Sequence, residues 1–469
     1  MIGSFTPREL KGKRLIGYCL GDLGILLSNM LEAVFAFQYY VYTINLNSVL
    51  VSIGVTSQLI IGSFFAVIFG VIVDNKKPGK NGKRRPFLLY ALPIWFIGSI
   101  LIWFPPWKCP ENNSLFLPTA LFFWIVTIMT SISRSLLYSV YLSMLPEQSQ
   151  TTENRESVAS IRSAFAIIAS IFALLIPLIV QSLLENPANV KWWESSGKVL
   201  LFYIPLTATI LAIFGLVSVI LIYFSVDESF YKRDSYQLEK TKILEAFKKM
   251  RIPLKDKNYI RFILAGFFIA ITGKTLGLLV FPFQTFLLEL KASEFFIYIF
   301  ISIFGKFGWY FLWKKVTKNK IVLVKSYFRV IFVALIASML DIFFLIGNLQ
   351  FGVKILLYII VWSTVLGSYY SYTLFSIPLG ASIVQEAAES INVSGTNLDK
   401  NISSISGSYY GLLYFVTYLG PAFASIFVGT FLSGSNEDNP VVITLLFFSM
   451  SIFYLISLFF IKGIKIKES

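Results

Sequence analysis

The feature that most constrains the fold of this chain is its series of long apolar segments separated by short polar ones. Of the 469 residues, 56% are hydrophobic and 14% are charged, whereas an average soluble domain has roughly 25% charged residues. Segments of about 20 apolar residues cross a bilayer as helices, because a helix satisfies its own backbone hydrogen bonds without water. We therefore predict twelve transmembrane helices, at residues 16–42, 50–73, 87–104, 118–145, 157–184, 197–226, 260–288, 294–313, 321–346, 353–380, 407–433 and 441–461.

The basic residues are unevenly divided between the two sets of predicted loops. One set carries most of the 40 Lys and Arg, whereas the other carries Lys108, Lys191, Lys198 and Lys291. Loops rich in Lys and Arg stay in the cytoplasm and contact anionic lipid. We therefore expect an integral protein of the cell membrane with both termini in the cytoplasm. The net charge of +15 reports this orientation rather than binding to nucleic acid.

The longest polar segment between predicted spans, 227–259, divides the chain into two halves. Its apolar residues recur at near-helical spacing, which predicts an amphipathic helix on the inner membrane surface. Six predicted spans precede this segment and six follow it. We therefore predict an all-α membrane protein with an N-terminal six-helix bundle over 1–226, a cytoplasmic linker over 227–259 and a C-terminal six-helix bundle over 260–469.

The residues on which most catalytic sites depend are scarce in this chain. It contains no histidine and two cysteines, which removes His-based triads, His proton relays and nearly all zinc-hydrolase sites. No nucleotide-binding glycine-rich loop or nucleophile constellation is visible. We therefore expect no enzymatic activity, no metal site and no cofactor. The expected partners are a small-molecule solute and membrane lipids, and we expect a monomer.

The basic loop after the second predicted span has an ordered pattern of residues. GVIVDNKKPGKNGKRRP (70–86) contains a glycine, three apolar residues, Asp74, a basic turn and then Arg84 and Arg85. This order resembles the loop between the second and third helices of major facilitator transporters. The resemblance implies a conformational latch made by Asp74, Arg84 and Arg85, with Gly70 allowing close helix approach. A solvated loop without a specific role is the alternative.

Three further parts of the chain are similar, in the same order, to one transporter family. They are GDLG (21–24) with QYYVYT (38–43), YLSMLPEQSQTTENRESVASIR (141–162) and GSYYGLLYFVTYLGPAFASIFVG (407–429). They resemble segments of the glycoside-pentoside-hexuronide:cation symporters, the group that includes melibiose permease. The resemblance implies the major facilitator fold, with alternating access to a site between two six-helix halves.

The resemblance carries over to some site residues and not to others. In the family, an acid in span one and an arginine in span five help to bind the sugar, and Asp22 and Arg162 occupy these positions here. The family's other charged site residues are replaced, by Tyr138 in span four, Gly62 and Ala66 in span two, and Tyr418 in span eleven. Two of these replacements remove the carboxylates that bind the coupling cation. The sequence therefore leaves open whether the coupling ion is a proton or sodium.

Ionisable side chains inside the predicted spans mark functional candidates, because burying each costs about 2.5–3.5 kcal/mol. Asp22 and Glu32 share the first span and lie roughly 15 Å apart at the helical rise. Asp22 needs a partner, water or a proton, and Arg162 or Arg134 is the natural partner. An acid without a nearby base would have a raised pKa and could carry a proton, so Asp22 and Glu32 are the coupling candidates.

Other candidates lie on faces that could line a cavity. Arg134 and Tyr138 are four residues apart and share one helix face, and we expect this polar face, with Ser131 and Ser135, to line a cavity. Lys274 and Lys306 are deep in spans seven and eight, where interhelical salt bridges are the alternative role. The candidate substrate-binding residues are Asp22, Arg162, Arg134, Tyr138, Lys274, Tyr39 and Tyr370, the two last as possible sugar-stacking or hydroxyl-bonding tyrosines.

These observations together predict a secondary active transporter that moves a small polar solute by alternating access. The resemblance implies a glycoside or sugar derivative, with coupling to a proton or sodium open. The surplus of bases over acids inside the spans also allows a lysolipid or organic-anion carrier of the same fold. The missing coupling carboxylates keep a third reading open, a membrane sensor or scaffold that does not transport.

Overall fold

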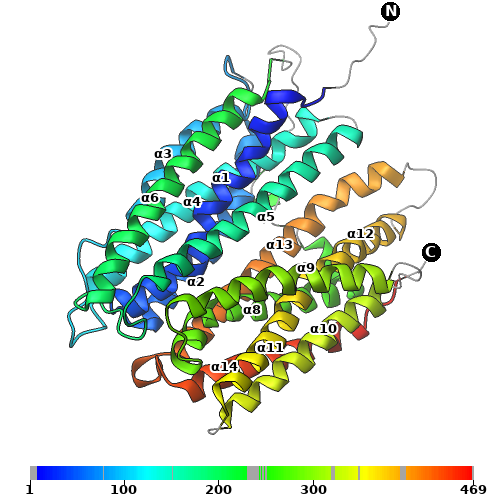
Figure 1. Ribbon diagram of the computed structural model, residues 1–469. Helices are drawn as coiled ribbons and strands as arrows, with labels where there is room; N and C mark the ends of the chain where they lie inside the picture. The colour runs from blue at the N-terminus through cyan, green and yellow to red at the C-terminus, as the bar shows by residue number, and fades with distance from the viewer. Residues whose placement is uncertain are drawn as a thin grey trace, which may run out of the picture. The chain divides into compact units, whose positions relative to one another are not determined.

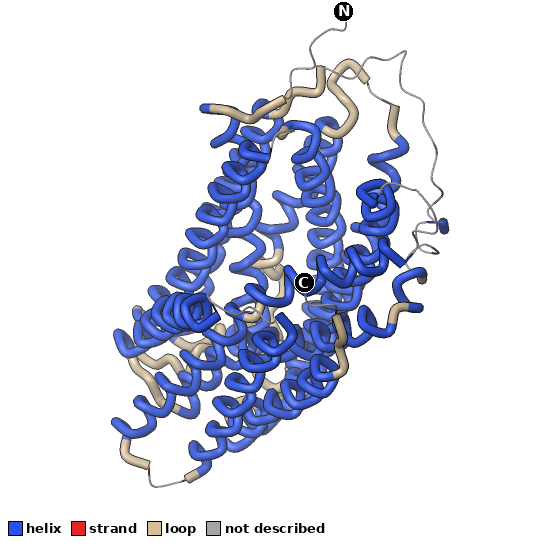
Figure 2. Tube along the Cα trace, turned by 90° about the vertical axis from the view of Figure 1, so that its right-hand side faces the viewer, coloured by secondary structure: helices blue, strands red, loops and turns tan. Residues whose placement is uncertain are grey.

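The computed structural model is helical in both halves of the chain (Figure 1; Figure 2). It describes residues 8–77, 79–149, 152–229, 242, 244–245, 248, 251–317, 323–346, 349–390 and 398–466. The chain divides into two compact units, Met1–Ile243 and Leu244–Ser469. The division falls within the predicted linker 227–259, but the amphipathic helix expected there lies largely outside the described residues.

The N-terminal unit is a bundle of long helices. Its described helices are α1 (Gly12–Gln38), α2 (Ser48–Asn75), α3 (Arg85–Leu101), α4 (Leu117–Gln148), α5 (Thr152–Ser182) and α6 (Ser195–Ser225). α1 packs mainly on α5 and α6, and α4 packs mainly on α2 and α3. Local sequence sets several helix starts. The Asn47 side chain accepts from Val49 N at 2.9 Å at the start of α2, as side-chain caps do.

The C-terminal unit repeats this pattern of packing. Its described long helices are α8 (Lys257–Pro282), α9 (Ile297–Thr317), α10 (Leu323–Met339), α11 (Phe351–Ser371), α12 (Thr373–Ser390), α13 (Leu398–Phe431) and α14 (Pro440–Lys462). α8 packs mainly on α13 and α14, and α9 packs on α11, just as α1 packs on α5 and α6, and α2 on α4. Asp256 caps α8 by accepting from Asn258 N at 2.9 Å.

The first helix of each unit also ends in the same way. α1 continues into the π-helix η1 (Tyr39–Thr43), and α8 continues into the π-helix η3 (Phe283–Leu287). Each π-helix is followed by a residue with positive φ, Asn45 at 67° and Glu289 at 54°, a conformation that residues other than glycine adopt infrequently. This shared feature, together with the matching helix pairs, indicates two structurally equivalent halves, as in transporters built from parallel repeats.

The described helices agree with the predicted membrane-spanning fold. Among the described residues, nine helices are long and apolar enough to cross a membrane. Two further predicted spans, 87–104 and 407–433, overlap with the shorter apolar helices Arg85–Leu101 and Phe415–Phe431. The remaining predicted span, 157–184, coincides with much of α5. The chain is therefore an all-α integral membrane protein.

Small residues set the closest helix contacts in the N-terminal unit. A Cβ atom on Gly24 of α1 would collide with the Ser218 side chain of α6 and lie 3.2 Å from Gly215 Cα. Close backbone approach through small residues is typical of helices packed in membranes. At Gly70, by contrast, a Cβ atom would meet no atom within 4 Å. Among the described residues of the N-terminal unit, no neighbouring helix therefore packs closely against Gly70, and its gating role stays a prediction.

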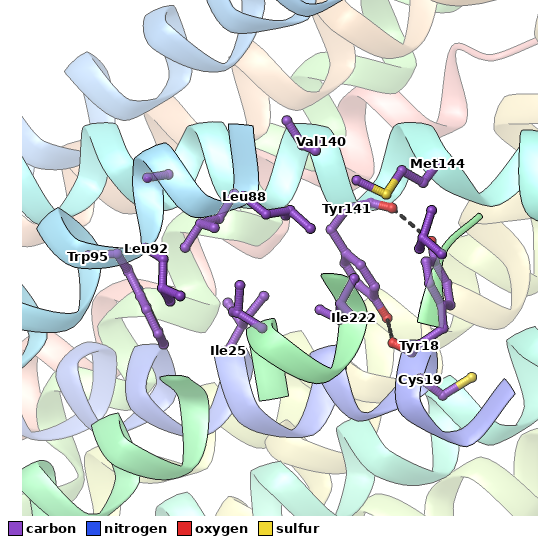
Figure 3. Packing of buried hydrophobic residues seen from close by; sticks show 14 of the residues in the cluster. Tyr18, Cys19, Ile25, Leu88, Leu92, Trp95, Val140, Tyr141, Met144 and Ile222 are labelled. Atoms are coloured by element: carbon purple, nitrogen blue, oxygen red, sulfur yellow. Dashed lines mark hydrogen bonds between the residues drawn. The ribbon is translucent and has the colours of Figure 1, made fainter. Parts of the chain in front are cut away.

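A hydrophobic cluster joins the helices of this bundle. Side chains of α1, α3, α4 and α6 meet in it, and Tyr18, Trp95, Tyr141 and Ile222 are fully buried (Figure 3). Such packing holds the α1 and α4 backbones in a defined register. It thereby positions the polar side chains that both helices carry beside the cluster.

Candidate functional site: two arginine–carboxylate pairs in the N-terminal unit

Asp22 and Arg162 form a two-pronged ion pair between α1 and α5. Arg162 Nε donates to Asp22 Oδ2, and Arg162 Nη2 donates to Oδ1 at 3.1 Å. Asp22 is only 4% exposed. This geometry matches the parallel N–H···O bonds that make arginine–carboxylate pairs strong and directional. The structure therefore pairs Asp22 with Arg162, one of the two partners considered from the sequence.

Two tyrosines complete the surroundings of Asp22. The Tyr141 hydroxyl lies 3.0 Å from Asp22 Oδ2 and 3.1 Å from Tyr18 O, and the Tyr18 hydroxyl donates to Tyr141 O at 2.7 Å. Figure 3 shows the two rings side by side, joined by these reciprocal bonds. The Arg162 guanidinium lies 4.9 Å from the centroid of the Tyr141 ring, within cation–π range.

Sequence reasoning missed Tyr141 and Tyr18. A signal for Tyr141 existed, because Arg134, Tyr138 and Tyr141 are spaced four and three residues apart and so share one face of α4. Tyr18 stands four residues before Asp22 on α1, which again places the two on one helix face.

Glu32 and Arg134 form a second ion pair, between α1 and α4. Arg134 Nη1 donates to Glu32 Oε2 at 3.0 Å and to Asn29 Oδ1 at 3.3 Å. Glu32 is 6% exposed, and its other oxygen, Oε1, is buried without a hydrogen-bond partner among the described residues. The Arg134 side chain is 20% exposed. The first pair therefore engages both carboxylate oxygens, whereas the second engages one.

Both ion pairs involve a stripe on α1 that carries Asp22, Asn29 and Glu32. The stripe on α4 carries Arg134, Tyr138 and Tyr141. Since α1 packs mainly on α5 and α6 and α4 mainly on α2 and α3, α1 and α4 are joined here by long polar side chains. A polar side-chain layer between two membrane helices is the kind of surface on which a polar solute can bind.

The serines of α4 do not belong to this layer. Ser131 Oγ donates to Gln58 O of α2, and Ser135 Oγ donates to Gly62 O, both at 2.8 Å. The glycine at position 62 permits the contact of Ser131 with α2, because a Cβ atom on Gly62 would collide with Ser131 Oγ. Ser131 and Ser135 therefore face α2 and bind its backbone. That the polar face of α4 lines a cavity stays a prediction.

The structure removes one premise of the coupling hypothesis. Asp22 and Glu32 are coupling candidates because a carboxylate that has no base nearby can carry a proton. Each of them lies against an arginine instead. Their role in coupling stays a prediction, and it would have to operate through opening of these pairs.

The remaining substrate-binding candidates lie away from the two ion pairs or in the other unit. Tyr39 is buried at the far end of the first span, roughly 25 Å along the helix from Asp22, where its hydroxyl donates to Trp103 O at 3.1 Å. In the C-terminal unit, Lys274 is half-buried on α8. Lys306 Nζ lies 4.3 Å from the ring centroid of Tyr370, a cation–π contact.

The basic loop is held by a residue far along the chain. Glu228 is 3% exposed and accepts from Arg84 N at 3.0 Å and from Arg85 N at 3.2 Å. A carboxylate at this position satisfies the free amides at the start of α3 and complements its helix dipole. The Arg84 side chain donates to Ser143 O of α4. The backbone of Asp74 is in α2, but its side chain lies outside the described residues.

These contacts connect the ends of α3, α4 and α6. Next to Glu228, Asp227 N donates to Gln148 Oε1 at 3.0 Å and Gln148 Nε2 donates to Asp227 O at 2.6 Å. The Ser229 amide, which donates to Asp227 Oδ1 at 2.9 Å, holds the pKa of Asp227 below its usual value. Sequence reasoning missed Glu228 because 144 residues separate it from Arg84.

We expect Glu228→Ala to lower the stability of the protein by about 1 kcal/mol, as loss of a capping side chain does. The matched control is Glu194→Ala, because Glu194 stands at the N-cap of α6 without a side-chain capping bond and is exposed. The midpoint of thermal unfolding in detergent measures both. Equal shifts for the two variants would contradict the capping role of Glu228.

Comparison with known proteins agrees with this architecture. The model of the family "MFS/sugar transport protein" matches residues 17–466. The Escherichia coli (strain K12) protein named "Putative sulfoquinovose importer" is 24% identical over 180 residues, which are 38% of this chain. The match covers only 37% of that relative's length.

Solved structures show the same fold. The nucleoside transporter NupG superimposes with a TM-score of 0.60 at 15% identity, over 97% of this chain and 100% of that chain. The xylose transporter XylE from E. coli superimposes with a TM-score of 0.60 at 14% identity, over 97% and 96%. These proteins are transporters rather than enzymes, and they confirm the predicted major facilitator fold. With the family match over nearly its whole length, the chain belongs to the MFS/sugar transport protein family.

Proposed function

We propose that the protein is a secondary active transporter of a sugar-type solute and that Asp22, Arg162 and Tyr141 bind the hydroxyl groups of this solute. The observation that carries the proposal is the buried, two-pronged Asp22–Arg162 pair in a chain of a sugar transport family. A charged pair inside a membrane bundle is expensive and marks a substrate or ion path by default.

The pair retains hydrogen-bonding capacity for a solute. Each carboxylate oxygen accepts about two hydrogen bonds, so Oδ1 of Asp22, which accepts only from Arg162 Nη2, can also accept from one hydroxyl. Arg162 donates to Asp22 through Nε and Nη2, and its Nη1 group has no acceptor among the described residues. Acceptors and donors side by side suit a sugar, whose hydroxyls both donate and accept.

The name of the E. coli relative supports a sugar as the substrate class. We further infer from the basic loops that both termini lie in the cytoplasm. In this orientation the Glu228-bound loop lies on the cytoplasmic side, and we infer that it acts there as a conformational latch.

Uptake into proteoliposomes tests the proposal. The purified protein is reconstituted, and uptake of labelled glycosides, uronides and sulfoquinovose is measured with a proton gradient, a sodium gradient or neither. We expect uptake of at least one sugar derivative above protein-free vesicles, and the gradient arms identify the coupling ion. Folded protein that transports none of them would contradict the proposal and favour a sensor or scaffold.

Tyr141→Phe tests the hydroxyl at the proposed site. The variant keeps the ring against Arg162 and removes the bond to Asp22, so we expect solute affinity to fall by about three- to tenfold. Tyr203→Phe on the exposed side of α6 is the control. Affinity measured by tryptophan fluorescence should change only for Tyr141→Phe, and an unchanged affinity would exclude this hydroxyl from the binding site.

A further inference from the structure

Arg134 and Arg162, which are both partly buried, use different edges of their guanidinium groups. Arg162 directs its Nε and Nη2 edge at both oxygens of Asp22, so this edge is closed. Arg134 binds Glu32 and Asn29 through Nη1 alone. Its Nε and Nη2 groups carry three N–H donors without an acceptor among the described residues. Within the described N-terminal unit, Arg134 thus presents an open edge where Arg162 presents a closed one.

An open Nε and Nη2 edge is a specific binding element. Its two parallel N–H groups fit two oxygens of a carboxylate, sulfonate or phosphate, which is why arginine dominates recognition of such groups. A lysine at this position would offer the charge without the fork. Arg134 is 20% exposed, so part of its side chain is within reach of a solute.

Glu32 supports the same interpretation. It holds Arg134 by Oε2, while Oε1 is buried without a partner among the described residues. A buried acceptor left without a donor costs about 1–3 kcal/mol, which a purely structural ion pair would avoid by engaging both oxygens, as Asp22 does. An incomplete pair is therefore better explained by a third participant that brings a donor and an oxyanion.

We propose that Arg134 recognises an anionic group on the solute through its Nε and Nη2 edge, while Glu32 Oε1 accepts a hydroxyl of the same solute. The proposal rests on the proposed transport of a sugar and narrows the substrate to anionic sugar derivatives, such as uronides or sulfonated sugars. Arg134 and Tyr141 are seven residues, roughly 10 Å, apart along α4. A glycoside that carries an anionic group spans this distance and contacts both ion pairs.

The experiment compares two ligands that differ only in charge. Dissociation constants of methyl glucuronide and methyl glucoside are measured by calorimetry on the full-length purified protein, with sulfoquinovose as a third ligand. Wild type, Arg134→Gln, Arg134→Lys and Arg329→Gln are compared. Arg329 is exposed on α10, so its substitution removes one positive charge without touching the proposed site.

We expect wild type and Arg329→Gln to bind the glucuronide at least about tenfold more tightly than the glucoside, as charge-assisted bonds to arginine require. Arg134→Gln should lose this preference while still binding the glucoside. Arg134→Lys should lose most of the preference for the glucuronide, because the planar edge is gone. The loss should be incomplete, because the positive charge opposite Glu32 remains. If Arg134→Gln does not fold, the preference of Arg134→Lys for the glucuronide over the glucoside tests the inference instead.

Other results overturn the inference in distinguishable ways. A preference for the glucuronide that survives both Arg134 substitutions would assign the anionic group to another residue. Equal binding of both ligands by wild type would overturn the anionic substrate and leave sugar transport standing. Wild type that neither binds nor transports any of the three ligands would overturn the proposed function itself.

Discussion

Asp22→Asn is expected to abolish sugar uptake and to destabilise the N-terminal unit by about 3 kcal/mol. Removing one partner of a buried ion pair leaves the other charge uncompensated, which costs about 3–5 kcal/mol. The lower end applies because the Arg162 side chain is 17% exposed. Uptake into proteoliposomes and the thermal unfolding midpoint of the same preparation measure the two effects.

A double variant separates binding from folding. Asp22→Asn combined with Arg162→Gln removes both charges, so stability should recover toward that of wild type while uptake stays lost. The control is Glu9→Gln, since Glu9 pairs with Lys11 in a surface ion pair in which the lysine is 78% exposed and such pairs contribute little. Full uptake by Asp22→Asn would remove Asp22 from the transport mechanism.

Gly24→Leu is expected to prevent stable folding of the N-terminal unit. The α1 backbone approaches α6 so closely at Gly24 that an added Cβ would collide with the Ser218 side chain and lie 3.2 Å from Gly215 Cα. Overpacking costs about 1–3 kcal/mol even where side chains can adjust, and here the obstacle includes backbone. The yield of monodisperse protein in detergent and its unfolding midpoint measure the effect.

Gly70→Leu is the matched control for this prediction. A Cβ atom on Gly70 meets no atom within 4 Å, so the larger side chain should leave yield and unfolding midpoint close to those of wild type. A comparable loss of stability in the two variants would contradict the importance of the α1–α6 contact, because leucine has a higher helix propensity than glycine and is not expected to destabilise a helix by itself. Uptake by a well-folded Gly70→Leu then tests the gating role predicted for this position.

The membrane-spanning architecture could be predicted because it depends on composition along the chain. A run of apolar residues long enough to cross a bilayer has few alternatives to a helix, and the described helices follow the predicted runs. The pairing of Asp22 with Arg162 was also within reach, since a short buried carboxylate needs a nearby base. The choice between Arg162 and Arg134 needed the family resemblance.

The use of each face of α4 could not be predicted. Ser131, Arg134 and Ser135 are neighbours in sequence, and all of them are polar, so their pattern suggested a single cavity face. In the folded unit the serines donate to α2 carbonyls while Arg134 reaches Glu32 on α1. Which helix lies against each face of α4 depends on how the six helices pack. The polarity of the α4 residues alone does not indicate it.

The sequence by itself determined that this protein is a twelve-span membrane protein, because hydrophobicity acts locally on each segment of the chain. Only the tertiary structure decided that Glu228 caps the start of α3 and that, among the described residues, Arg134 keeps an open edge while Arg162 does not. Both depend on residues more than 100 positions apart in the sequence, whose partners are selected by packing rather than by local sequence.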